Sequence, residues 1–182
     1  MTAITTTYLE MTACDQLRPK KTTDARFRVL ETSVKQWQFN RFLYLLVGED
    51  WAWRDKLAWS DERWNSYVEA DGLKTCVAYY DGSPAGYFEL FTQEAEIEIA
   101  YLGLAPQFIG RGLGGPLLTH AIEEAWGLNP KRVWVHTCTL DHPSALKNYQ
   151  SIGMVVFKTE TTVPNRVRMA NPTSPFSVNV SF

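Results

Sequence analysis

The sequence predicts an α/β (α+β) fold, with a mainly antiparallel sheet and one parallel β-α-β crossover. Residues 74–91 follow the two-residue period of strands on either side of Asp81 and Gly82, which is typical of a β-hairpin. A third strand is expected directly afterwards, at 95–104. A glycine-rich loop, a helix and a strand at 132–140 come next, so strands 95–104 and 132–140 are expected to run parallel.

The other elements are predicted from hydrophobic period and from residues typical of helix ends. Ser60 is a suitable helix N-cap, and Gly153 stands where helices commonly end. Pro116 falls in the first turn of the helix after the glycine loop, where a missing N–H costs little. Residues 13–31 are polar and are left unassigned. The remaining elements are a strand at 5–12, helices at 33–46, from 60, at 113–125 and at 144–152, and a strand at 154–163.

Length and composition indicate one globular domain. The chain has 182 residues, 45% of them hydrophobic, and we expect a domain over 1–163 and an extended arm over 164–182. A net charge of -2 does not favour nucleic-acid binding. The sequence contains no run of eighteen apolar residues, so no membrane span is predicted. The first twenty residues lack the pattern of a secretory signal, so a cytoplasmic protein is expected. The arm could support a homodimer by strand addition.

Cysteine and histidine spacing gives no indication of a metal site. Three cysteines are far apart with no C-x-x-C pair, and three histidines show no H-E-x-x-H spacing. We therefore predict no metal, and reduced thiols packed in the core.

A glycine-rich loop precedes the helix at 113–125, with glycines at 110, 112, 114 and 115. Backbone N–H groups there can point into one concavity, and the helix N-terminus adds partial positive charge, so the loop suits a phosphate or pyrophosphate. Arg111 could add a charged hydrogen bond. The loop also matches G-x-G-x-x-G, but its place past mid-chain and the absence of an acidic residue about 20 positions later argue against a dinucleotide-binding oxidoreductase.

Two segments together resemble the GNAT superfamily of acyl-CoA-dependent N-acetyltransferases. After a strand and an apolar-proline step, Gln107, Gly110 and Gly112 fit the family pattern [RQ]-x-x-G-x-[GA] at the start of a helix. In the second segment, Ala145 and Tyr149 follow a strand and a turn at the family spacing and precede a glycine. The resemblance covers residues 73–160 and is weak over 1–72. It departs from the pattern at His142, where asparagine is usual, and at Met154, where phenylalanine is usual.

The resemblance implies a central sheet with a splayed parallel strand pair and helices on both faces. It also implies acetyl-CoA as acyl donor, with the pantetheine amides paired to the first splayed strand and the pyrophosphate at the glycine loop. The implied cofactor-binding residues are Leu102, Gly103, Leu104, Gln107, Ile109, Gly110, Arg111, Gly112, Leu113, Gly114, Gly115, His142, Ala145 and Asn148.

The implied reaction is direct attack of a small-molecule amine or protein amine on the thioester, which needs a base and an acid. Tyr149 matches the family's acid position, and a phenol stays protonated at neutral pH. For the base we prefer Glu98, because carboxylates are depleted from strand interiors, with Glu96 and Glu89 as substitutes. Simple alternation places Glu96 and Glu98 on the strand face that carries Leu102 and Leu104. A core aromatic for Tyr149 and a salt bridge for Glu98 are the structural alternatives.

Three further alternatives stay open. Cys138 could form an acyl-cysteine intermediate, although core packing is favoured for it. Trp51 and Trp53 could line an apolar or cation-binding acceptor pocket, although packing on the sheet is favoured for any single tryptophan. The chain could also be a non-catalytic acyl-CoA-binding or regulatory module, with an intact cofactor loop and an acceptor site filled by tryptophans or by the C-terminal arm.

Overall fold

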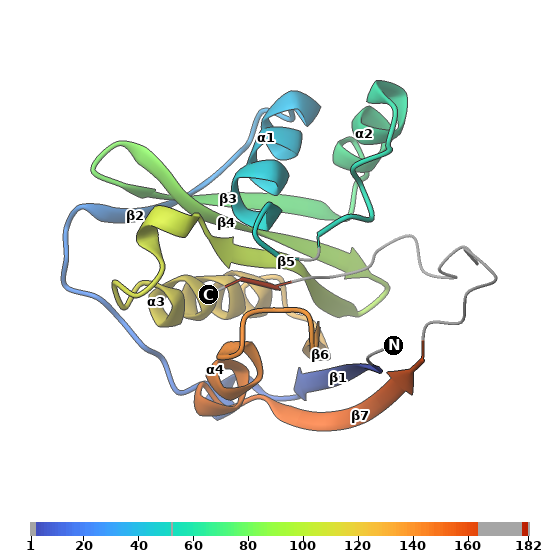
Figure 1. The fold of residues 1–182 in the computed structure, drawn as a ribbon. Helices are drawn as coiled ribbons and strands as arrows, with labels where there is room; N and C mark the ends of the chain where they lie inside the picture. The colour runs from blue at the N-terminus through green and yellow to red at the C-terminus, as the bar shows by residue number, and fades with distance from the viewer. Residues whose placement is uncertain (1–2, 52, 164–179, 182) are drawn as a thin grey trace.

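The computed structural model describes residues 3–51, 53–163 and 180–181, and a single mixed sheet crosses it (Figure 1). Its strands are β1 (Ile4–Met11), β2 (Phe27–Glu31), β3 (Leu73–Tyr80), β4 (Ser83–Gln93), β5 (Glu96–Leu104), β6 (Arg132–Cys138), β7 (Val155–Thr162) and β8 (Val180–Ser181). They lie in the order β2-β3-β4-β5-β6-β1-β7, with β8 paired to β5 off this path. Most neighbours are antiparallel, so the predicted fold class is confirmed.

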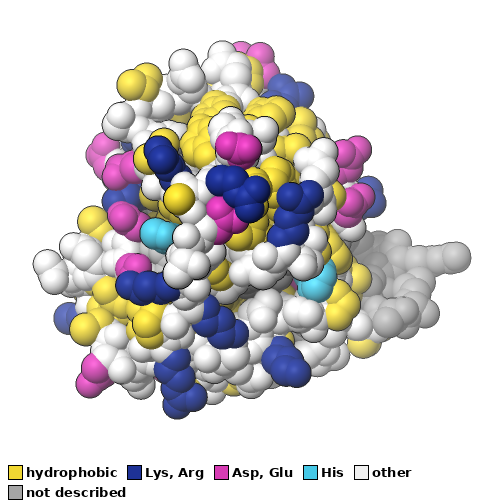
Figure 2. Space-filling view, turned by 90° about the vertical axis from the view of Figure 1, so that its left-hand side faces the viewer, with side chains coloured by type: hydrophobic (Ala, Val, Ile, Leu, Met, Phe, Trp, Pro, Cys, Tyr) yellow, Lys and Arg dark blue, Asp and Glu magenta, His cyan; other side chains and the backbone are white. Residues whose placement is uncertain are grey.

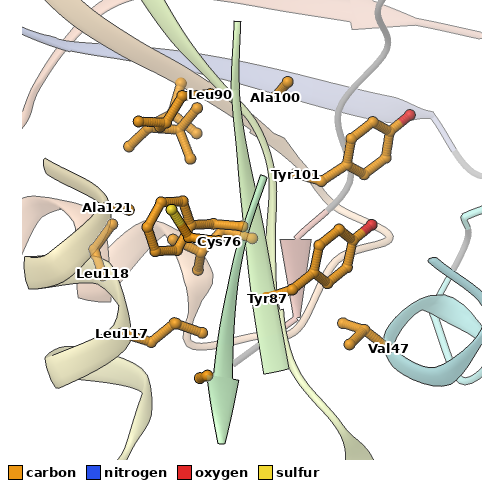
Figure 3. Packing of buried hydrophobic residues seen from close by; sticks show 14 of the residues in the cluster. Val47, Cys76, Tyr87, Leu90, Ala100, Tyr101, Leu117, Leu118 and Ala121 are labelled. Atoms are coloured by element: carbon orange, nitrogen blue, oxygen red, sulfur yellow. The ribbon is translucent and has the colours of Figure 1, made fainter. Parts of the chain in front are cut away.

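Helices cover both faces of the sheet, as the resemblance implied: α1 (Trp37–Gly48), α2 (Asp61–Val68), α3 (Gly114–Trp126) and α4 (Ala145–Ser151). Figure 3 shows Leu117, Leu118 and Ala121 of α3 on one side of the central strands, and Val47 of α1 on the other side. Two short 3-10 turns, η1 (Cys14–Gln16) and η2 (Pro106–Phe108), join strands to the following segments. The core therefore has two apolar layers, one on each face of the sheet.

The predicted hairpin and the predicted parallel crossover are both present. Asp81 and Gly82 turn β3 into β4 with φ angles of 51° and 85°, the left-handed backbone of a two-residue hairpin. β5 and β6 run parallel, and their pairing ends at Glu98 and Trp134. Beyond that point β5 continues to Leu104 without a β6 partner among the described residues, so the parallel pair opens there.

The freed edge of β5 is paired by the far end of the chain. Val180 and Ser181 form β8, which runs parallel to β5 opposite Leu102 and Gly103. The rest of the arm predicted over 164–182 lies outside the described residues. This contact uses the same stretch of β5 backbone that the family resemblance assigned to pantetheine.

A β-bulge in β5 corrects the strand face that simple alternation predicts for Glu98. Tyr101 pairs with Glu89 and Ile99 with Leu90, so Ala100 is one residue more than β4 matches. Because of this extra residue, Glu98 and Tyr101 lie on the same face of β5, and the Tyr101 ring lies 3.7 Å from the Lys56 ammonium on the side of α1 and α2. Figure 3 shows Tyr101 on that side beside Tyr87. Leu102 follows Tyr101 and points to the opposite face, so the expected shared face with Glu98 is wrong.

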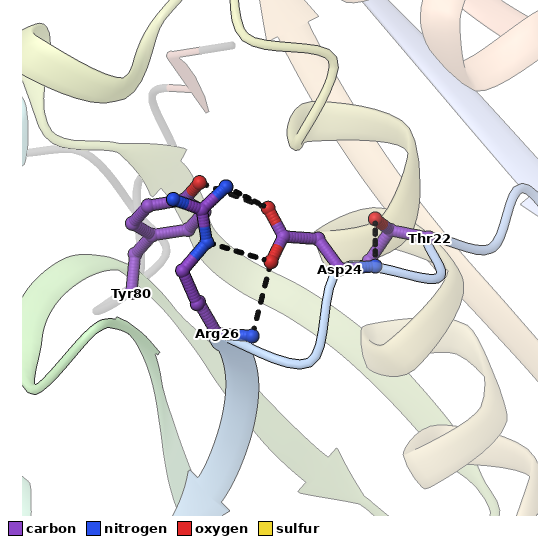
Figure 4. A network of polar contacts seen from close by, with 4 residues as sticks. All are labelled: Thr22, Asp24, Arg26 and Tyr80. Atoms are coloured by element: carbon purple, nitrogen blue, oxygen red, sulfur yellow. Dashed lines mark hydrogen bonds and ion pairs between the residues drawn. The ribbon is translucent and has the colours of Figure 1, made fainter.

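Strand β2 lies inside the segment that the sequence left unassigned. It pairs with β3 at the edge of the sheet, and only its first residue, Phe27, is buried. The preceding turn is fixed by Asp24, whose carboxylate accepts hydrogen bonds from Arg26 Nε at 2.9 Å and Tyr80 Oη at 2.8 Å (Figure 4). Edge position and polar sequence together explain why no apolar period marked this strand.

The structure corrects two expectations, one about the cysteines and one about the start of the first helix. Cys76 is buried, but Cys14 is exposed on η1, so the thiols are not all in the core. The first helix begins at Trp37 rather than Ser33, because Gln36 is still extended with φ of -140°. No helix in the described part of the chain is both long and apolar enough to cross a membrane.

Replacing Gly153 by alanine is expected to destabilise the fold far more than replacing Gly82. Both glycines have positive φ, 111° and 85°, which costs an alanine about 1–2 kcal/mol. A Cβ at Gly82 meets nothing within 4 Å, whereas one at Gly153 would collide with the backbone oxygen of Gln16. Overpacking adds about 1–3 kcal/mol. Urea unfolding of the two variants measures the difference, and equal losses would contradict this account.

Candidate active site

The glycine loop contains glycines with two different roles. Gly110 and Gly112 have φ of 80° and 75°, and a Cβ on either would meet no atom within 4 Å. These two positions need glycine for backbone conformation and lie under open space. Gly115 is different, because a Cβ there would lie 2.9 Å from the Lys20 side chain. Gly115 therefore allows a second segment of the chain to pack against the start of α3.

A hollow of about 480 Å³ opens beside this loop. Its walls come from the loop, the first turn of α3, the turn before α4, and two lysines from the segment ahead of β2. They are Lys20, Lys21, Ile109, Gly110, Gly112, Gly114, Gly115, Pro116, His142, Ser144 and Asn148. Seven of these residues are predicted cofactor-binding residues, which the fold brings together from two segments about 30 positions apart.

Lys20 and Lys21 are site residues that sequence reasoning missed. The Lys20 backbone N–H donates to Thr119 Oγ1 at 2.9 Å, and the Arg18 N–H donates to the Ile152 carbonyl at 2.9 Å. These two hydrogen bonds hold the segment between α3 and the end of α4. In the sequence, the pair of adjacent lysines was the one feature that could have suggested an anion site, and a polar segment without hydrophobic period does not show where it packs.

The chemistry of the hollow suits a phosphate or pyrophosphate. The first N–H groups of a helix lack partners within the helix, and they and the positive end of the α3 dipole favour an anion. Two lysines line the hollow: Lys21 pairs with Glu123 at 3.2 Å, and the Lys20 ammonium donates to Ser151 Oγ at 2.5 Å. Lys and Arg side chains also outnumber acidic ones over the lower half of the face in Figure 2.

Some predicted cofactor-binding residues lie beside the hollow rather than in its wall. Gln107 is on η2, and the Arg111 guanidinium lies 5.2 Å from the centre of the Phe108 ring. Leu113 and Ala145 bury their side chains in the core. Leu102, Gly103 and Leu104 lie on β5 beyond its last pair with β6.

Glu98 is a buried carboxylate at the point where the parallel pair opens. The His136 Nδ1 atom lies 3.7 Å from its Oε1 atom. Burial raises the pKa of Glu98 to about 8, and the positive charge of Lys56 acts in the opposite direction. A carboxylate whose pKa lies near neutrality is suited to general-base work.

The two substitute bases are engaged elsewhere. Glu89 is buried, and its two oxygens accept hydrogen bonds from Asn40 Nδ2 at 2.8 Å and Tyr67 Oη at 2.6 Å. Glu96 is partly exposed and pairs with Arg132 Nε at 2.8 Å. Because both carboxylates already serve these contacts, the geometry favours Glu98 over them.

Tyr149 is fully buried on α4. Burial raises the pKa of its phenol well above the usual value, and the nearby negative charge of Asp141 adds to the shift. The phenol is therefore protonated at neutral pH and able to donate a proton or a hydrogen bond.

Cys138 lies at the end of β6 and is half-buried. Burial raises the pKa of its thiol, with a further contribution from the carboxylate of Asp141. A raised pKa disfavours the thiolate that covalent catalysis needs, which argues against an acyl-cysteine intermediate. Within the described ranges, no group of three His, Cys, Asp or Glu side chains could hold a metal ion.

The tryptophan-rich region both packs in the core and lines a hollow. Trp53 is buried in the core, 5.0 Å from Tyr101 between ring centres, and together with Trp51 lines a hollow of about 540 Å³ along α1. The Lys56 ammonium lies over the rings of Trp59 and Trp64.

Comparison with known proteins identifies the family. The family model described as the acetyltransferase (GNAT) family matches residues 32–154. The chain therefore belongs to the GNAT acetyltransferase family, the class that its open parallel pair and glycine-loop hollow had indicated. Comparison with curated proteins gave no match.

Solved structures share the fold at low identity. A GCN5-related N-acetyltransferase from Sphaerobacter thermophilus has a TM-score of 0.68 and 14% identity, over 88% of this chain and 51% of that one. One from Kribbella flavida gives 0.61 and 14%, over 85% and 55%. An aminoglycoside acetyltransferase from an uncultured soil metagenomic sample gives 0.61 and 16%, over 84% and 99%. This chain thus spans about half the length of the first two.

Proposed function

We propose that this protein transfers an acetyl group from acetyl-CoA to a primary amine of a small molecule or a protein. The observation that carries the proposal is the hollow in which the glycine loop, the start of α3, the turn before α4 and two lysines converge. Membership of the GNAT family supports acyl transfer in general, and this hollow supports a donor that carries a pyrophosphate.

The residues that line the hollow fit the pyrophosphate of acetyl-CoA. Backbone N–H groups near Gly110, Gly112 and Gly114 would hold the pyrophosphate, and Lys20 and Lys21 would add charge-assisted contacts. The thiol end would then lie along β5 beyond its last pair with β6, where Leu102 and Leu104 offer backbone groups. The proposal requires the thioester to lie within reach of the Glu98 carboxylate and the Tyr149 phenol.

The proposed step forms an amide and releases a thiol. The acceptor nitrogen attacks the thioester carbonyl carbon, the carbon–sulfur bond breaks, the nitrogen loses a proton, and the sulfur gains one. Glu98 is proposed to accept the proton from the nitrogen, because it is buried at the opening of the strand pair. Tyr149 is proposed to supply the proton for the sulfur, because its phenol remains protonated.

One observation favours a second candidate, an acyl-CoA-binding module without turnover. β8 pairs with Leu102 and Gly103, the stretch of β5 backbone proposed to pair with pantetheine. Both partners cannot occupy one strand edge, so a donor must displace β8 or bind only by its nucleotide end. A chain in which β8 always stayed in place would bind without reacting.

Calorimetric titration with coenzyme A, followed by measurement of thiol release from acetyl-CoA with a panel of amines, tests the proposal. We expect measurable binding, and thiol release with at least one amine above the rate without an acceptor. Binding without thiol release from any amine would favour the non-catalytic module. No binding of coenzyme A would contradict both candidates.

Tyr149→Phe is expected to lower kcat by about 100-fold, the lower range for loss of one proton-transfer group, and to leave the coenzyme A Kd unchanged. Only a hydroxyl is removed from a buried ring, so the binding hollow stays intact. Tyr79→Phe, in the β3–β4 hairpin, is the matched control and should keep full activity. Steady-state kinetics with calorimetry measure both quantities, and an unchanged kcat would remove the role.

Glu98→Gln is expected to abolish the rise of kcat/KM with pH. The base must be ionised, and burial has raised its pKa to about 8, so wild-type kcat/KM should increase through that pH and level off above it. Glutamine cannot titrate, and the loss at high pH should be about 100-fold. The profile is measured with the least basic amine accepted, to keep acceptor titration apart. A rise retained in Glu98→Gln would exclude Glu98 as the base.

A further inference from the structure

A separate hollow of about 280 Å³ opens at the turn between β4 and β5, and we call it the acidic hollow. Its described walls carry three carboxyl groups and neither lysine nor arginine. The residues that line it are Phe91, Gln93, Glu94, Glu96, Glu98 and Trp134. It thus has the opposite charge character to the hollow at the glycine loop, which two lysines line.

Glu98 connects the acidic hollow with the proposed reaction. It is 5% exposed, and its Oε1 atom accepts no hydrogen bond from any described residue. The His136 Nδ1 atom lies 3.7 Å away, which is beyond hydrogen-bond distance. A buried carboxyl oxygen without a donor is costly. Because Glu98 lines the hollow, an N–H group of a bound amine can supply the donor that the described residues do not.

The other two carboxylates lie toward the turn. Glu96 and Glu98 are two residues apart on one face of β5, so their positions along the strand differ by about 7 Å. Glu94 stands at the tip of the turn with φ of 54° and is exposed. The turn is held in place, because the Lys131 backbone N–H donates to the Ala95 carbonyl at 2.7 Å. The acidic groups therefore form a row from the turn to the buried carboxyl group.

Neighbouring cations do not balance this row. The Arg132 guanidinium lies 2.8 Å from a Glu96 oxygen and 2.8 Å from a Glu10 oxygen, so one positive charge serves two carboxylates. No described ion pair involves the third carboxylate, Glu94. Even with the exposed Lys131 counted, carboxylates outnumber cations here. The mouth of the acidic hollow thus favours a positively charged ligand.

The remaining walls and the size of the acidic hollow limit the shape of that ligand. Phe91 of β4 and Trp134 of β6 provide aromatic walls, which suit a methylene chain and attract an ammonium. Its volume lies just below the range of about 300–1,000 Å³ that is usual for small-molecule sites. A slender aliphatic chain therefore fits better than a large ring system.

The larger hollow along α1 has no such preference for positive charge. Its wall contains one carboxylate, Glu49, and one guanidinium, Arg54, among mostly apolar residues. Opposite charges in one wall give no net attraction for a cation. Glu98 is also not among the residues that line this hollow, so it offers no direct approach to the proposed base.

We propose that the acceptor binds in the acidic hollow, and that it is a slender aliphatic amine with a second positive charge. Its reacting nitrogen would lie at Glu98, and its second ammonium about 7 Å away, near Glu96 and Glu94. This inference rests on the proposed acetyl transfer and narrows the class of acceptor.

Putrescine and n-butylamine test the inference, because they share a four-carbon chain and only putrescine carries a second ammonium. With acetyl-CoA, kcat/KM for putrescine should exceed that for n-butylamine by about tenfold, the size of one hydrogen bond between charged groups. Glu94→Gln should lower this ratio by about threefold, through a higher KM for putrescine, and leave n-butylamine unchanged. Glu49→Gln removes one carboxylate from the hollow along α1 and is the matched control, which should keep the ratio.

Equal kcat/KM for the two amines, or a preference that survives Glu94→Gln, would overturn the inference and leave acetyl transfer intact. A preference lost in Glu49→Gln instead would place the acceptor along α1 and overturn it equally. Should no amine be acetylated, the proposed function fails by itself, and calorimetric titration of the protein with each amine decides the inference. Tighter binding of putrescine that Glu94→Gln weakens would then support it, and equal binding would overturn it.

Discussion

The short contact between β5 and β6 is the constraint on which the site depends. The two strands share a register only from Glu96 and Arg132 to Glu98 and Trp134, and β5 then continues alone. An unpaired stretch of strand inside a sheet has backbone donors and acceptors that need partners. Here β8 supplies them, and a donor with its own amides is a natural competitor for the same edge.

Two kinds of chemistry meet at this opening, and each is carried by different elements. Positive charge and free N–H groups come from the glycine loop, α3 and the lysines ahead of β2. Carboxyl groups come from β5 and β4, where Glu98 and Glu89 are buried. The bulge at Ala100 places Glu98 and Tyr101 on the same face of β5. This one strand therefore carries both the buried carboxyl group and the backbone stretch at Leu102 and Gly103.

Burying charge is costly, and this protein buries several charged groups together. Asp55 and Glu89 are satisfied by tyrosine hydroxyls, and Lys56 is satisfied by ring faces. Burial is the largest influence on Glu98 and raises its pKa to about 8. Trp64 is buried in the core and Trp59 packs against it, and both rings also present a face to the Lys56 ammonium.

The sequence by itself determined the order of elements, the hairpin at Asp81 and Gly82, the parallel crossover and the glycine loop before α3. These features depend on hydrophobic period, turn residues and short spacings, all of which can be seen in the amino-acid sequence itself. Only the tertiary structure decided that Lys20 lines the hollow beside the loop, that β2 forms an edge of the sheet, and that Lys56 lies among aromatic rings from three parts of the chain. Those contacts join residues tens of positions apart, and their energy comes from packing and burial that no local pattern encodes.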